Sequence, residues 1–269
     1  DLKLAEEVAE ASIILLENHD DILPLENEEL IFVAGPTCCS KPALHGGWSY
    51  SWQGHDESTY PESTMTVVQG LRTEFGGGRI VCPIERAFGS EDHYEIDFVQ
   101  AAKNCDVIVL CLGEDAYAET PGAIDDLALP AEQIKLAQAA LQTGKPVVLL
   151  LLEGRGRLVP EVAESADAIL LAMRPGTAGA QSIARVMSGR VNPGGVLPFT
   201  YHRNSGDIIP YDHRFLSKYA RRLPGPLTQD GFQPQWAFGH GLTYSDLQTA
   251  IDTVLIPEYL RTDSVTVLY

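Results

Sequence analysis

Apolar and polar positions along the chain alternate between two kinds of segment. The first kind is a short run of consecutive apolar residues rich in Val, Ile and Leu, which is typical of strands buried on both faces of a sheet. These runs predict strands at residues 30–34, 79–82, 106–112, 146–152, 168–172 and 196–200.

The second kind of segment has apolar residues spaced three or four positions apart, which predicts amphipathic helices. Pro130 stands at the start of one of them, where a helix tolerates proline. The pattern predicts helices at residues 2–17, 64–75, 94–103, 130–142, 159–165 and 178–188.

Strands that alternate with helices form a mostly parallel sheet, because each helix carries the chain back to the end of the sheet where the previous strand began. We therefore expect an α/β fold, a three-layer sandwich with five or six strands and helices on both faces. Residues 1–24 are expected to form an N-terminal helix and linker, and residues 25–200 the sandwich domain. Residues 201–269 are rich in Pro, Gly and aromatic residues, and we expect an extended tail packed on the core. Its last segment, 264–269, is predicted to be a lone strand, as at the start of a truncated further module.

Charge narrows the range of partners. The 269 residues include 37 acidic and 19 basic side chains, a formal net charge of −18, which disfavours binding to nucleic acid or to an anionic membrane surface. The apolar runs are too short to span a bilayer. We therefore expect neither nucleic acid nor a membrane as a partner.

Cofactor and metal motifs are missing from the sequence. There is no Walker A loop and no G-x-G-x-x-G after a strand, so no nucleotide cofactor is expected. The seven histidines show no ligand spacing, and the five cysteines form no C-x-x-C pair, so no metal site is expected either. The number and spacing of the cysteines indicate neither an oxidising nor a reducing cellular compartment. They are Cys38, Cys39, Cys82, Cys105 and Cys111.

Two long loops follow predicted strands, at residues 36–63 and 113–129, on the edge where ligands of parallel sheets gather. The first contains Trp48 and Trp52, whose indole rings suit the C–H faces of a sugar. The second is rich in carboxylates, which a glycosidase needs in pairs to protonate a leaving oxygen and to attack the sugar. Asp125 and Asp126 are expected to cap the next helix and to solvate the surface. The five carboxylates are Glu114, Asp115, Glu119, Asp125 and Asp126.

Several motifs together resemble the C-terminal α/β-sandwich domain of glycoside hydrolase family 3, the β-glucosidase and exo-β-glucanase family. The similarity runs through nearly the whole chain. The motifs are AEASIILLEN with ILPL at 9–18 and 22–25, GGWSYSWQG at 46–54, VLCLGEDAYAETPGAIDDLAL at 109–129, PGGVLPF at 193–199 and FGHGLTY at 238–244.

The resemblance implies roles for individual residues. The glutamate of the Y-x-E motif, the general acid/base of this branch, falls on Glu119, and the tryptophan of the W-Q-G motif, Trp52, would stack on the sugar at the leaving-group subsite. Trp48 would support that wall or anchor the loop. For Arg155, a structural ion pair is favoured over the alternative of orienting a loop or a sugar hydroxyl. The sequence departs from the family pattern at Ala123, where the family usually has aspartate, and at Gly156, where it has proline.

The resemblance also implies a partner domain. In such enzymes the nucleophile, an aspartate, lies in a preceding (β/α)8 barrel, which needs about 250 residues of its own. The resemblance thus implies a retaining exo-acting enzyme that hydrolyses terminal β-D-glucosyl residues of a β-glucoside or β-glucan oligosaccharide. It favours an extracellular or periplasmic location, and we expect this chain to be inactive alone.

Two other hypotheses remain open at this point. The first is a non-catalytic sandwich domain that binds carbohydrate or scaffolds a partner. The second is a flavodoxin-like regulatory domain that binds a nucleotide or flavin.

Overall fold

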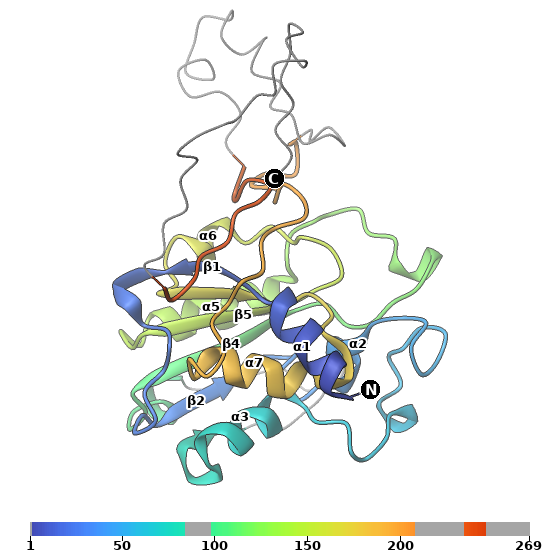
Figure 1. Ribbon diagram of the computed structural model, residues 1–269. Helices are drawn as coiled ribbons and strands as arrows, with labels where there is room; N and C mark the ends of the chain where they lie inside the picture. The colour runs from blue at the N-terminus through green and yellow to red at the C-terminus, as the bar shows by residue number, and fades with distance from the viewer. Residues whose placement is uncertain (1, 84–97, 208–233, 246–269) are drawn as a thin grey trace, which may run out of the picture.

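A six-stranded sheet forms the centre of the molecule (Figure 1). The computed structural model describes residues 2–83, 98–207 and 234–245. Along the sheet the strands lie in the order β1-β6-β5-β4-β2-β3, with β1 antiparallel to β6 and the other neighbours parallel. The α/β fold expected from the sequence is confirmed. The strands are β1 (Ile14–Asn18), β2 (Ile31–Ala34), β3 (Ile80–Val81), β4 (Val107–Gly113), β5 (Val147–Leu152) and β6 (Ala168–Leu171).

Helices cover both faces of the sheet. On one face, α3 and α7 pack directly on the strands and α1 lies against α7, as Figure 1 shows. On the other face lie α5 and α6, with α4 beside α5. No helix in the described ranges is both long enough and apolar enough to cross a membrane. The helices are α1 (Leu2–Ser12), α2 (Lys41–His45), α3 (Val67–Phe75), α4 (Phe98–Ala101), α5 (Ala131–Leu141), α6 (Pro160–Ala163) and α7 (Gly179–Met187).

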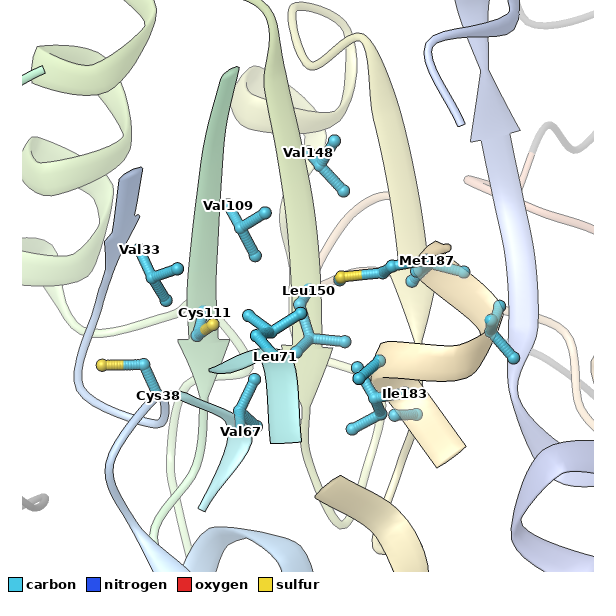
Figure 2. Close-up of a cluster of buried hydrophobic side chains, with 14 of the residues drawn as sticks. Val33, Cys38, Val67, Leu71, Val109, Cys111, Val148, Leu150, Ile183 and Met187 are labelled. Carbon is cyan, nitrogen blue, oxygen red and sulfur yellow. The ribbon is translucent and has the colours of Figure 1, made fainter. Parts of the chain in front are cut away.

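The central strands are apolar throughout because each of their faces meets a helix layer. Along β4, Val109 and Cys111 enter the core under α3 and α7, whereas Ile108 and Leu110 enter the core under α5 and α6. Figure 2 shows the first core, in which Leu71 of α3 packs toward β4 and β5. Alternate side chains of one strand therefore fill two cores, which explains the uninterrupted apolar runs.

The expected helix at residues 2–17 is wrong at residues 13–17. The helix α1 ends at Ser12, and Ile14–Asn18 forms the antiparallel edge strand β1. Ile13 and Leu15 enter one core, Ile14 and Leu16 enter the other, and all four are almost fully buried. Four consecutive buried apolar residues need cover on opposite sides, and a strand between two helix layers provides it, whereas a surface helix does not.

The expected strand at residues 196–200 is also wrong. Leu197 exchanges backbone hydrogen bonds with Gly239 and His240, and Tyr201 forms an isolated bridge with Trp236, but no strand forms. Pro198 interrupts this segment and removes a backbone donor from any ladder there. Residues 234–245 pack against the β1 edge. The strand expected at 264–269 lies outside the described residues.

Candidate functional site

The candidate residues lie on loops at one edge of the sheet. The tryptophan loop (residues 35–66) follows β2, and the carboxylate loop (residues 114–130) follows β4, the parallel neighbour of β2. Figure 1 shows both loops, in light blue and green, on the same side of the molecule. This is the carboxyl edge, where ligands of parallel sheets bind.

Gln53 joins the two loops through both atoms of its side-chain amide. Its nitrogen donates to the carbonyl oxygen of Ala118 at 3.1 Å, and its oxygen accepts from the Ala118 N–H at 3.0 Å. Trp52 directly precedes Gln53, and Glu119 directly follows Ala118. The amide pair therefore brings together the backbones that carry two of the candidate residues.

The two tryptophans form an exposed aromatic surface. Trp48 is 68% exposed and Trp52 is 50% exposed, and their ring centroids lie 6.4 Å apart. The Trp48 N–H donates to the carbonyl oxygen of Trp52 at 2.9 Å, which fixes the hairpin that presents both rings. Large apolar rings gathered at a surface are characteristic of binding sites rather than of solvated loops.

Glu119 lies on a strained turn. Its φ is +55° and its ψ is −141°, a conformation that non-glycine residues rarely adopt, and its carbonyl oxygen accepts from the Gly122 N–H at 2.9 Å. Its side chain is exposed, and no hydrogen bond or ion pair joins its carboxylate to another residue in the described part of the chain. The turn therefore presents a carboxylate that is available to a ligand.

Behind this turn lies the buried carboxylate of Glu114. Its Oε1 accepts from Arg157 Nη1 at 2.9 Å and lies 3.1 Å from Arg155 Nε. Its Oε2 accepts from the Tyr117 hydroxyl and from the Gly154 N–H, both at 3.1 Å. A buried carboxylate with three hydrogen-bond donors and a second arginine beside it is well compensated, so the role of Glu114 is to hold the loops in place.

Tyr117 and Arg155 support the turn that carries Glu119. The Arg155 guanidinium lies over the Tyr117 ring at 4.1 Å and donates to the Gly122 carbonyl oxygen at 2.7 Å. Gly122 lies so close to this ring that a Cβ there would stand 2.4 Å from it. Burial raises the pKa of the Tyr117 hydroxyl, which keeps it a donor to Glu114. The structural ion pair expected for Arg155 is confirmed.

Arg174, which follows β6, ties three loop segments together. Its guanidinium donates to the carbonyl oxygens of Ala43 at 2.6 Å and Glu114 at 3.0 Å, and also to that of Asp115 at 2.7 Å. Burial lowers the pKa of Arg174, and the nearby Glu114 carboxylate opposes this shift. This role of Arg174 could not be predicted from sequence, because the acceptors are backbone carbonyls that any residue provides.

Asp125 and Asp126 are exposed, as expected of surface acids, but they do not cap a helix. Pro130 occupies the N-cap position of α5, and no side chain caps that end. Asp126 instead accepts from the Ala128 N–H at 2.9 Å within the loop. The expectation that these acids cap the helix is wrong, because the chain turns between them and the helix start.

A cavity of about 280 Å³ lies between the carboxylate loop and the segment after β5, and Glu114, Tyr117, Arg155 and Arg157 are among its lining residues. Glu119, Trp48 and Trp52 do not line it. The candidate residues thus stand on an open surface outside this cavity.

The fold and this surface define an α/β-sandwich domain whose loops suit a carbohydrate. The chain belongs to glycosyl hydrolase family 3: the model of the family's C-terminal domain matches residues 13–244.

Named relatives agree with this assignment. A lysosomal β-glucosidase from Dictyostelium discoideum is 38% identical, over 91% of this chain and 30% of its own length. A periplasmic β-glucosidase from Salmonella typhimurium is 31% identical, over 98% of this chain and 37% of its own length. Among solved structures, a mutant β-glucosidase from Listeria innocua in complex with laminaribiose superposes with a TM-score of 0.74 at 30% identity, over 90% of this chain and 33% of that chain. The chain therefore spans about a third of the length of these relatives.

Proposed function

We propose that this chain is the acid/base-carrying domain of a retaining, exo-acting β-glucosidase or β-glucan hydrolase, and that the enzyme removes terminal β-D-glucosyl residues. The observation that carries the proposal is Glu119, an exposed carboxylate on a strained turn that Gln53 ties to the tryptophan loop. The relatives named β-glucosidases, and the laminaribiose complex of one solved structure, support a β-glucoside as the substrate class.

In the proposed reaction Glu119 starts protonated and transfers its proton to the glycosidic oxygen. A second carboxylate attacks the anomeric carbon from the opposite face of the sugar, and the bond to the leaving sugar breaks. Glu119, now ionised, takes a proton from water, whose oxygen attacks the anomeric carbon and displaces the second carboxylate. The sugar is released with retained configuration, and Glu119 is protonated again.

The second carboxylate is proposed to come from a (β/α)8 barrel that precedes this domain in the same protein. A barrel of about 250 residues is compatible with relatives that are roughly three times as long as this chain. The open surface around Glu119 supports this arrangement, since a site completed by a second domain has no wall of its own on that side.

Trp52 is proposed to stack on the sugar at the leaving-group subsite, and Trp48 to support or extend that wall. Both rings are largely exposed, lie 6.4 Å apart and are tilted by 54° to each other, so each offers an apolar face to a sugar. Because Trp52 and Glu119 are joined through Gln53 and Ala118, a sugar on the platform would lie next to the acid.

The variant Glu119→Gln in the full-length protein tests the assignment. Hydrolysis of laminaribiose should fall about 10²–10⁴-fold in kcat/KM, because its leaving sugar needs a proton. An aryl glucoside with an acidic phenol should still glycosylate the enzyme, because that leaving group departs without protonation. Added azide should then restore turnover by attacking the glycosyl-enzyme and yield β-glucosyl azide.

Asp125→Asn provides the matched control, since it removes an exposed carboxylate from the same loop. It should leave the kinetics on both substrates unchanged. Unchanged laminaribiose hydrolysis by Glu119→Gln, or equal losses in the two variants, would remove Glu119 from the acid/base role.

The second candidate function is a non-catalytic domain that binds carbohydrate or a protein partner. The exposed tryptophan pair favours it, because such a platform binds sugar without any chemistry. Both candidates predict an inactive isolated chain, but only the acid/base domain should restore hydrolysis when it is added to the barrel.

A further inference from the structure

Three cysteines from two chain segments meet at the same carboxyl edge of the sheet, apart from the turn that carries Glu119. Cys38 and Cys39 follow β2, and Cys82 follows β3, the parallel neighbour of β2. The three sulfur atoms all lie within 4.8 Å of one another, and the Cys38 and Cys39 sulfurs are 3.6 Å apart. Figure 2 shows Cys38 beyond the end of β2, near Val67 at the edge of the core.

The distances suit a metal ion with sulfur ligands. With metal–sulfur bonds of about 2.3 Å, two sulfurs of a tetrahedral zinc site lie about 3.8 Å apart. The three sulfurs already approach this spacing, so small side-chain rotations would complete it. Disulfide formation would instead require two sulfurs to close to about 2.05 Å.

The cluster combines one buried cysteine with two that solvent can reach. Cys38 is fully buried, whereas Cys39 and Cys82 are partly exposed and pack against the rim of the same core. The Cys38 carbonyl oxygen accepts from the Val68 N–H at 3.1 Å, so the start of α3 holds this segment in place. An ion can therefore reach sulfurs whose backbone is already positioned.

We propose that Cys38, Cys39 and Cys82 bind one thiophilic cation of the Zn²⁺ or Cu⁺ class. Three thiolates are soft ligands, which favour these ions over Mg²⁺ or Ca²⁺. Cu⁺ accepts three sulfurs as a complete set, and Zn²⁺ would take a fourth ligand from solvent at the exposed side.

The spacing of the cysteines does not predict this site, because Cys82 lies 43 residues after Cys39 (82 − 39) and no short motif joins them. The bound ion would tie the segment after β3 to the base of the tryptophan loop, which continues from Cys39 through α2 to Trp48. It lies outside the proposed chemistry and does not depend on the role of Glu119.

Metal titration of the fully reduced chain tests the site. Zn²⁺ and Cu⁺ are added separately in competition with a chromogenic chelator, and Co²⁺ serves as an optical probe of thiolate ligation for the zinc arm. We expect one ion per chain, a thiolate-to-cobalt charge-transfer band, and protection of three thiols from alkylation. Absence of stoichiometric binding by both Zn²⁺ and Cu⁺ would overturn the proposal.

Cys39→Ser and Cys82→Ser are the informative variants, because both side chains are partly exposed and tolerate a hydroxyl better than the buried Cys38 does. Each should weaken binding at least tenfold, with an unchanged circular dichroism spectrum. Cys105→Ala is the control, since Cys105 is buried in the core on the opposite face of the sheet and alanine adds no polar group there, and it should bind as the parent does. Equal affinity in all three variants would also overturn the proposal.

Discussion

Glu153 is a buried carboxyl group directly after β5 that neither proposed site uses. It has no exposed surface, and its Oε1 lies 2.8 Å from the Tyr201 hydroxyl. That hydroxyl also lies 2.7 Å from the Arg157 carbonyl oxygen, and it has one proton for two acceptors. Burial raises the pKa of Glu153 to about 8, and the nearby Glu114 carboxylate adds to the shift. Because of this raised pKa the Glu153 carboxyl is neutral at pH 7, and its proton is a second one available to these closely spaced oxygens.

This raised pKa predicts a pH-dependent stability. The unfolded chain releases the Glu153 proton near its ordinary pKa of 4.5, whereas the folded protein keeps it up to about pH 8. The contribution of this group is therefore complete below pH 4.5 and is lost as the pH rises towards 8. Glu153→Gln keeps a neutral donor at all pH values, so its free energy of unfolding should fall less than that of the parent between pH 5 and 8.5.

Urea unfolding at each pH measures the effect, which should reach a few kcal/mol across this window. Glu161→Gln is the control, because Glu161 is an exposed glutamate on α6, and it should follow the parent curve. Parallel curves for Glu153→Gln and the parent would contradict a neutral Glu153.

The contact between the tryptophan loop and the carboxylate loop depends on a glycine. A Cβ on Gly47 would stand 2.2 Å from the carbonyl oxygen of Tyr117, which is backbone and cannot move aside alone. Gly47 does not have a positive φ, so alanine can adopt its backbone conformation. The effect of the substitution therefore depends only on the space between the two loops. Glycine is therefore required at position 47 by the close packing of the two loops, and not by the local backbone conformation.

Gly47→Ala is expected to push the loops apart, with a cost of about 1–3 kcal/mol as for other overpacked sites. The free energy of unfolding in urea measures this cost, and laminaribiose hydrolysis by the full-length protein should fall in kcat/KM. Gly77→Ala is the control: no heavy atom lies within 4 Å of its added Cβ, so stability and kinetics should match the parent. Equal stability of the two variants would show that the loops can separate without cost.

The layered fold could be predicted from sequence because β4 and β5 are uninterrupted apolar runs that are easily recognised as buried strands. Their residues are fully buried and apolar at every position, and length and flanking turns separate them from helices. The strand β1 could not be predicted in the same way, because Ile13–Leu16 directly continues a helical pattern and its burial depends on β6, which lies more than 150 residues further on.

The candidate site could be predicted only at its surface. Trp48, Trp52 and Glu119 lie on loops that leave neighbouring parallel strands, so their meeting at one edge follows from topology. The supports behind them do not follow, because the partners of Arg174 and Gln53 are mostly backbone groups that carry no sequence signal. The cysteine cluster could not be predicted for a different reason, because its two segments meet through the pairing of β2 and β3, which are far apart in the sequence.

Considered as a whole, the described structure presents the candidate acid and the aromatic platform on an open surface. The network of Glu114, Arg155 and Arg157 lies beneath that surface and joins the carboxylate loop to the segment after β5. A surface that is ordered in advance lowers the entropy cost of completing a site with a second domain. A split active site therefore predicts that two separately folded halves can recombine.

The prediction is that this chain restores hydrolysis when it is mixed with the (β/α)8 barrel of its own full-length protein. Neither part alone should release glucose from laminaribiose. At a fixed barrel concentration, activity should rise with chain concentration and then saturate, because each barrel needs one acid/base domain.

The chain with Asp125→Asn should restore activity like the parent. The chain with Glu119→Gln should bind the barrel equally well, as measured by sedimentation, and restore no activity on laminaribiose. A mixture that associates but hydrolyses nothing would favour the non-catalytic domain, and recovery with Glu119→Gln would assign the acid to another residue. These two outcomes can be told apart because association and hydrolysis are measured separately. The experiment therefore shows whether the exposed surface takes part in catalysis or only in binding.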